Sequence, residues 1–199
     1  MPHIDYYFSV LSPFTYLAGT RLEHAVVKHD ATITYRPLDI GALFARTGGT
    51  SPAERHESRK ALRLQEMRRQ AQKQGMKLKL QPPHWPTNPA PASYAIIAAQ
   101  AKGDGNIGAF VHAITRSCWA DKRDIADDEV IKDCLVECGF DPKLADSGLL
   151  EGAETYGKNL EDAVAAGVFG APFYITDTDE RFWGQDRIED LDAYLAGAL

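Results

Sequence analysis

A serine lies where the first predicted strand passes into the first predicted helix. Residues 4–10 are rich in β-branched and aromatic side chains, which predicts a buried strand, and Ser12 precedes Pro13, a residue that suits the first helical position. Ser12 therefore either caps the helix or lies at the positive end of its dipole, a place for an anion or a thiolate. A hydroxyl cannot cycle through a disulfide, so redox exchange by Ser12 and Thr15 is excluded. The hydroxyl can instead donate a hydrogen bond to a thiolate.

A proline stands at the mouth of a third predicted strand. Gly170 and Ala171 precede Pro172, and residues 173–176 are apolar or β-branched. A proline entering a central strand is unusual unless its peptide bond is cis, so we predict a cis bond here. That bond would leave the N–H and C=O of Ala171 free to pair with an extended ligand. The alternative is a trans proline on an edge strand.

A further group of polar residues separates a short strand, residues 181–183, from the last helix. Trp183 and Gly184 lead into Gln185 and Asp186. Asp186 is a natural N-cap for the helix that follows, and Gln185 would present a side-chain amide beside it. Together they would hold the carboxylate and ammonium of an amino acid, whereas the alternative is capping alone.

The predicted elements place these groups in one α/β unit. The first strand, the helix that follows it and a second strand at residues 32–36 form a β-α-β unit, which predicts that the two strands pair in parallel. The chain ends with strands at 172–176 and 181–183, joined as a hairpin, and a helix at 187–199. Between them, helical patterns cover residues 53–74, 90–101, 107–119, 127–138, 142–149 and 151–166. We therefore expect an α/β domain formed by residues 1–40 and 151–199, interrupted by an inserted helical domain of residues 41–150.

The insertion contains two segments that could form a pocket wall. The helix at 53–74 is densely charged, so we expect its charged side chains to face solvent. The alternative is that one or two of Arg59, Lys60 and Arg63 face an anionic ligand. Residues 81–91 form a proline-rich irregular loop. As substrate contacts we predict Phe14, Thr15, His84, Trp85 and Asn88.

Composition excludes several classes of function. The chain has 199 residues, 44% of them hydrophobic, and a net charge of −6, which argues against nucleic acid or an anionic membrane as partner. It shows no membrane-spanning run and no signal peptide. Cys118, Cys134 and Cys138 form no CxxC pair, and we expect core packing and no metal site. We expect a cytoplasmic protein.

These motifs together resemble a known family. Residues 12–15, Ser-Pro-Phe-Thr, stand where DsbA-type thioredoxin-like proteins have CxxC, and residues 170–172 resemble their cis-proline loop. Residues 182–187, Phe-Trp-Gly-Gln-Asp-Arg, are similar to the FWGxDR signature of 2-hydroxychromene-2-carboxylate isomerases, relatives of the kappa-class glutathione transferases. The resemblance covers the whole chain. It implies a thioredoxin-like fold of the DsbA or kappa type with a large helical insertion.

The resemblance also implies a cofactor and a set of roles. The family binds glutathione, usually as a homodimer. The residue matching Ser12 hydrogen-bonds the glutathione sulfur, the one matching Ala171 pairs with the cysteinyl backbone, and those matching Gln185 and Asp186 hold the γ-glutamyl end. With these we assign the glutathione site to Ser12, Ala171, Pro172, Trp183, Gly184, Gln185 and Asp186.

Three functions remain at this point. The first is a glutathione-dependent isomerase of an aromatic pyruvate compound, in which Ser12 is catalytic and glutathione is regenerated. The second is a kappa-like glutathione transferase or peroxidase, which consumes glutathione. The third is a non-catalytic thioredoxin-fold binding module. Phe173 and Gln185 depart from the commoner family residues, Thr and Ser or Asn, and leave the small aromatic electrophile unidentified.

Overall fold

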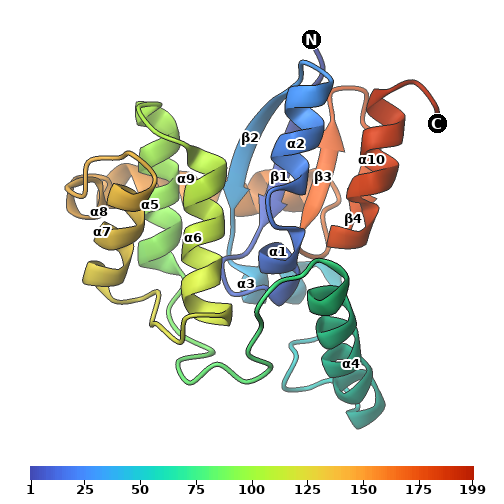
Figure 1. The fold of residues 1–199 in the computed structure, drawn as a ribbon, viewed down its shortest axis with the longest axis horizontal. Helices are drawn as coiled ribbons and strands as arrows, with labels where there is room; N and C mark the ends of the chain where they lie inside the picture. The colour runs from blue at the N-terminus through green and yellow to red at the C-terminus, as the bar shows by residue number, and fades with distance from the viewer.

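The computed structural model describes residues 1–199 and has a four-stranded sheet at its centre (Figure 1). Its strands are β1 (His3–Phe8), β2 (Thr32–Pro37), β3 (Phe173–Thr176) and β4 (Arg181–Trp183), in the order β2-β1-β3-β4. β1 is parallel to β2, whereas β3 is antiparallel to both β1 and β4. The predicted β-α-β unit, the hairpin and the central position of the third strand are confirmed.

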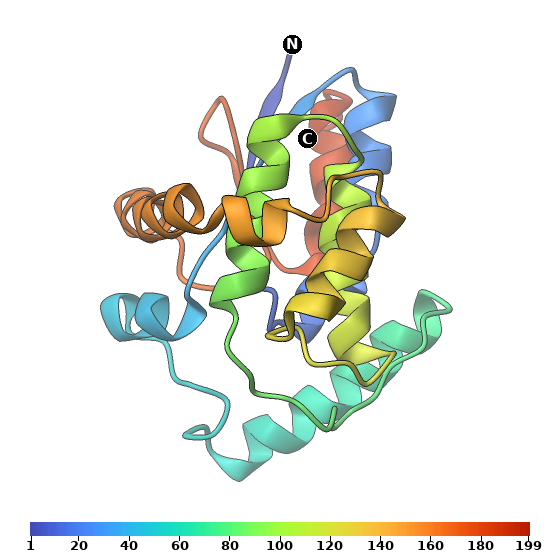
Figure 2. The ribbon, with the colours of Figure 1, turned by 90° about the vertical axis from the view of Figure 1, so that its left-hand side faces the viewer.

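Most of the helices lie between β2 and β3 in the chain. The helices are α1 (Pro13–Ala18), α2 (Arg21–Lys28), α3 (Ile40–Thr47), α4 (Glu57–Lys73), α5 (Ala90–Lys102), α6 (Ile107–Trp119), α7 (Asp128–Glu137), α8 (Leu144–Ser147), α9 (Leu149–Ala165) and α10 (Ile188–Leu195), with a 3-10 turn, η1, at Gln185–Arg187. No strand interrupts the run from α3 to α9, so the helical insertion is confirmed. Figure 2 shows α4 lying across one end of the molecule, away from the helices α5 to α8. The domain boundaries at residues 40 and 151 stay a prediction.

Both faces of the sheet are buried. Ile4, Tyr6 and Phe8 alternate along β1 and pack in the larger core, to which α1, α2, α5, α6 and α10 also contribute. Tyr7 faces the other side, where it packs with Phe173 and residues of α3 and α9. The sheet is thus held between two helical layers, and the turns at its ends are fixed from both sides.

The insertion is tied to the sheet by side-chain amides. Gln100 of α5 accepts a hydrogen bond from the Tyr35 N–H at 2.7 Å and donates to the Tyr35 C=O at 3.1 Å. Asn159 of α9 donates to the Pro37 C=O at 3.0 Å. β2 is an edge strand, whose unpaired backbone groups need partners. These bonds supply them and fix the insertion relative to the strand-end turns.

Two local predictions differ from the structure. Apolar residues repeat at helical spacing from Phe14 to Val26, a pattern that predicts one helix after Ser12, but the chain breaks at Gly19, whose φ of +60° ends α1 after six residues. Helix α3 was not predicted, yet Asp39 caps it by accepting hydrogen bonds from the N–H groups of Gly41 at 2.8 Å and Ala42 at 3.1 Å. The short α1 therefore carries only a small dipole to the site.

Candidate functional site

Ser12 joins two distant parts of the chain. Its Oγ accepts a hydrogen bond from the Thr15 N–H at 3.3 Å, so the side chain does cap α1. The same hydroxyl donates to the C=O of Ala171 at 3.4 Å, across 159 residues of sequence. The two groups that the sequence singled out thus meet at the end of the sheet. The long bond to the carbonyl leaves the hydroxyl proton easy to redirect toward a ligand.

The backbone around Ala171 is arranged as predicted. The Ala171–Pro172 peptide bond is cis, which confirms the prediction. The N–H of Ala171 has no hydrogen-bond partner within the chain. Its C=O receives only the long bond from Ser12, so the pair of backbone groups remains available to a ligand. That a ligand uses them stays a prediction.

A pocket of about 460 Å³ has Ala171 in its wall, whereas the predicted site residues Ser12 and Pro172 do not line it. The sequence predicted six of its lining residues: Phe14, Ala171, Trp183, Gly184, Gln185 and Asp186. Gly170 and Arg187 also line it, and α3, α4 and the loop between them add residues that the sequence did not indicate: Phe44, Arg55, Glu66 and Gln70. Acidic and basic side chains therefore face the same cavity, which suits a ligand that carries both charges.

Asp186 does not cap the last helix, and that prediction is wrong. The residue lies inside η1, and α10 begins only at Ile188 without a side-chain cap. Its carboxylate, 53% exposed, forms its one ion pair with the Arg187 guanidinium, at 3.8 Å. Gly184 allows this position, because its φ is +111° and a Cβ there would lie 2.5 Å from Asp186 Oδ1. The carboxylate is therefore free for a cation in the pocket.

Gln185 is less available than predicted. The residue is only 2% exposed, and its side-chain oxygen accepts a hydrogen bond from the guanidinium of Arg21 on α2. Arg21 also donates to the C=O groups of Leu17 at 3.1 Å and Ala18 at 3.2 Å, at the end of α1. The Gln185 oxygen is thus committed to the protein, and only its Nε2 donor remains for a ligand. The sequence does not indicate Arg21 as part of the site, because it lies 164 residues from Gln185 in the chain.

Trp183 forms the aromatic wall of the pocket, where it touches the segment that precedes Pro172. The indole of Trp183 lies against Gly170, where an added Cβ would come within 2.5 Å of the indole nitrogen. The ring also packs edge-to-face against Phe169, with centroids 4.8 Å apart, and Trp183 remains 55% exposed. Figure 1 shows α4 below this end of the sheet. The Trp183 wall of the pocket is therefore in contact with solvent.

The residues predicted to touch a second substrate are only partly brought together. Thr15 is 3% exposed and packs in the core, which corrects its placement at the substrate. His84 and Asn88 are exposed and do not line the pocket beside Ala171, and the Asn88 side chain instead accepts a hydrogen bond from the Ala90 N–H at 3.0 Å. Phe14 does line the cavity beside Ala171.

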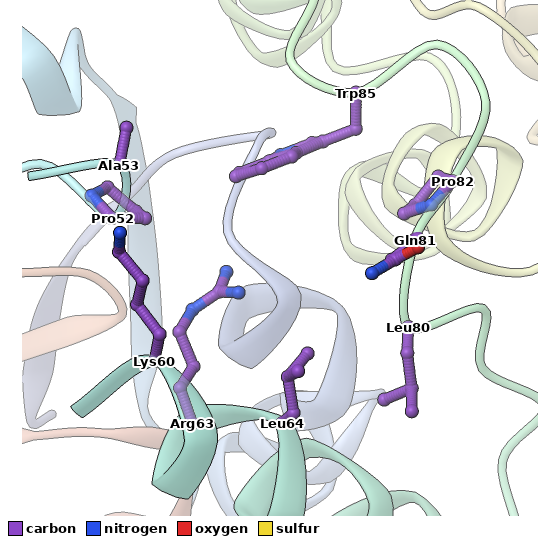
Figure 3. A pocket seen from close by; sticks show the side chains of 9 residues that line it. All are labelled: Pro52, Ala53, Lys60, Arg63, Leu64, Leu80, Gln81, Pro82 and Trp85. Atoms are coloured by element: carbon purple, nitrogen blue, oxygen red, sulfur yellow. The ribbon is translucent and has the colours of Figure 1, made fainter. Parts of the chain in front are cut away.

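Trp85 lines a second pocket, of about 470 Å³, together with Lys60, Arg63 and Leu64 of α4 (Figure 3). Its indole N–H donates to the C=O of Leu11 at 3.0 Å, which holds the ring beside the turn that carries Ser12. Arg63 reaches up from α4 with its guanidinium 5.5 Å from the centre of the Trp85 ring, and Lys60 lies next to it. The charged face of this helix is thus not wholly in solvent.

The remaining chemistry-bearing residues are structural. Cys118, Cys134 and Cys138 are buried in the larger core, which confirms their packing role, and burial raises the pKa of Cys118 to about 12. No three His, Cys, Asp or Glu side chains gather as a metal site. No helix has the length and apolarity to cross a membrane.

The sheet order, the cis-proline turn and a serine at the strand-to-helix turn define a thioredoxin-type α/β protein whose CxxC position holds no cysteine. Residues 3–196 match the family described as DSBA-like thioredoxin domain. The chain belongs to this family, and the predicted DsbA-like fold with its helical insertion is confirmed.

Several proteins similar to this chain carry the same name. A 2-hydroxychromene-2-carboxylate isomerase of Sphingobium xenophagum is 31% identical over 96% of this chain and 97% of its own. One of Pseudomonas putida is 28% identical over 96% of this chain and 93% of its own. A solved structure of 2-hydroxychromene-2-carboxylate isomerase is 24% identical, with a TM-score of 0.77 over 98% of this chain and 95% of that one. This protein is thus a DsbA-family member similar to these isomerases.

Proposed function

We propose that this protein is a glutathione-dependent isomerase of 2-hydroxychromene-2-carboxylate or a similar aromatic pyruvate compound. The observation that carries the proposal is the meeting of Ser12 and Ala171, which puts a hydroxyl donor beside an unpartnered backbone N–H. Ala171 also lines the pocket that contains the half-exposed carboxylate of Asp186. Similarity over nearly the full length to proteins named as such isomerases supports the reaction class.

The groups around the cavity fit the chemistry of glutathione. The ligand is an extended peptide with a thiol and an amino-acid end that carries an ammonium and a carboxylate. Ala171 offers an N–H and a C=O to its cysteinyl backbone, in the manner of strand addition. Asp186 pairs with the ammonium, and the Nε2 of Gln185 donates to the carboxylate.

Ser12 is the residue that acts on the sulfur. Its hydroxyl turns from the Ala171 carbonyl to the thiol sulfur and stabilises the thiolate by a charge-assisted hydrogen bond. A free thiol has a pKa of about 8.5, and each unit of lowering corresponds to about 1.4 kcal/mol. Because α1 has only six residues, the hydrogen bond contributes more than the helix dipole. When bound, glutathione would supply a nucleophile that adds reversibly to a conjugated, ring-opened substrate, so that a double bond becomes single and rotates.

Product analysis tests the proposal. Purified protein, glutathione and 2-hydroxychromene-2-carboxylate are mixed, and the product is followed by chromatography while total free thiol is measured. An isomerase forms product without net loss of thiol and needs glutathione only in catalytic amounts. Thiol loss in step with product would instead assign a transferase or peroxidase. Glutathione binding without any turnover would leave a binding module and overturn the proposal.

A further inference from the structure

Arg63 is a cation without an acidic partner on the wall of the second pocket. Its guanidinium forms no ion pair and no hydrogen bond within the chain, unlike Arg69 on the same helix, which pairs with Glu66 at 2.8 Å. Partial burial lowers the pKa of Arg63, and the neighbouring charge of Arg55 lowers it further. An unpaired, partly desolvated cation is costly to the protein, and an anionic ligand would offset that cost.

The walls around Arg63 are flat and apolar. Trp85 lies over the guanidinium, and Pro52, Leu64, Leu80 and Pro82 line the cavity beside it (Figure 3). Figure 3 also shows the ammonium of Lys60 on the Arg63 side, away from Leu80 and Pro82. The pocket thus has a positive end and an apolar end, with an indole face spanning them. This arrangement suits a planar ring that carries a carboxylate.

The pocket lies next to the proposed reaction centre. The hydrogen bond from Trp85 holds the indole at the carbonyl of Leu11, the residue that precedes Ser12. The segment before α4 contributes Pro52 and Ala53 to the second cavity and Arg55 to the first, and α4 lines both cavities, so they lie side by side along this segment and helix. A ligand seated against Trp85 would therefore lie beside the sulfur held by Ser12.

We infer that the pocket between Trp85 and α4 binds the second substrate as an aromatic carboxylate, with Arg63 as the residue that selects its charge. The inference rests on the proposed function only for the identity of the reaction. Arg63 pairs with the carboxylate, Trp85 stacks on the ring, and Lys60 adds positive charge while it remains paired with Glu57 at 2.8 Å. Neutral aromatic electrophiles are selected against, because they leave the guanidinium without an anionic partner.

Two probes of matched shape test the assignment without any turnover. Calorimetry measures binding of trans-cinnamate and of cinnamyl alcohol, which has the same ring and chain length and no charge, to the full protein with and without glutathione. We expect wild type to bind cinnamate at least tenfold more tightly. In Arg63→Met this preference disappears, whereas Arg63→Lys retains part of it. Arg59→Met, one turn away on an exposed part of α4, leaves it unchanged.

The outcomes separate this inference from the proposed function. A preference for cinnamate that survives in Arg63→Met would overturn the assignment, and so would acetate binding as tightly as cinnamate, since the pocket would then recognise charge alone. Glutathione affinity measured on the same variants is expected to remain at the wild-type value. If wild type bound cinnamate through Arg63 but did not bind glutathione, the inference would hold and the proposed function would fail.

Discussion

Replacing Asp186 by Asn removes the one carboxylate that we assign to the ammonium of glutathione. The sequence predicted that Asp186 caps the last helix, in which case the change would mainly affect stability. In the structure α10 has no side-chain cap, and the one ion pair of the carboxylate is with Arg187, at 3.8 Å. Asp186→Asn should therefore leave the thermal midpoint close to wild type while it weakens glutathione binding.

The expected magnitude follows from the exposure of the group. A hydrogen bond to a charged group contributes about 1.5–3 kcal/mol, which corresponds to roughly a 10- to 150-fold change in affinity. Asp186 is 53% exposed, so solvent screening places the effect at the low end, at about a tenfold rise in Kd. Raising the salt concentration should narrow the difference between wild type and variant, because the lost interaction is between charges.

Calorimetric titration with glutathione measures this change, and Asp190→Asn is the matched control. Asp190 binds the same arginine, Arg187, at 2.9 Å, but does not line the pocket. We expect Asp190→Asn to bind glutathione as wild type does. Equal affinity of Asp186→Asn and wild type, or an equal loss in both variants, would refute the assignment of the carboxylate to the ligand.

Three other substitutions probe how the pocket and the core are held. Gly184→Ala forces the adjacent carboxylate to move and should raise the glutathione Kd at least tenfold by calorimetry, whereas Gly197→Ala, at a φ of +72° with open space around it, should not. Arg21→Met releases the side-chain oxygen of Gln185 and should weaken glutathione binding by about tenfold in the same assay. Burial raises the pKa of the Glu23 carboxyl in the folded protein above its value in the unfolded chain. The folded state therefore holds this proton more tightly, and the contribution of Glu23 to stability falls as the pH rises from about 4 through the folded-state pKa. The free energy of unfolding of wild type minus that of Glu23→Gln should therefore decrease over this range, and a constant difference in denaturant titrations would show that burial does not perturb the carboxyl.

The parts of the site that depend on local sequence could be predicted. Ser12 before Pro13 indicates a helix start, and a proline at the mouth of a central strand indicates the turn at Pro172. Each feature is decided by residues within one turn of each other. The strand patterns then fix the sheet that brings Ser12 and Ala171 together.

Contacts between distant helices could not be predicted. Arg21 and Gln185 are 164 residues apart, and Arg63 meets Trp85 only because α4 folds back under the proline-rich loop. A charged helix such as α4 has the same pattern whether its cations face solvent or a pocket. Gly19 was similarly ambiguous, since a single glycine in an apolar repeat is tolerated in some helices and ends others.

The thiolate pKa of bound glutathione tests the central role of Ser12 most directly. Ultraviolet absorbance of the complex against pH gives this value for wild type, Ser12→Ala and Ser12→Gly, of which the glycine variant largely keeps the N-cap. Loss of one charge-assisted hydrogen bond, about 1.5–3 kcal/mol, predicts a pKa higher by about one to two units in both variants. If the pKa of glutathione bound to Ser12→Gly equals the wild-type value, Ser12 is only a helix cap and the proposed mechanism is wrong.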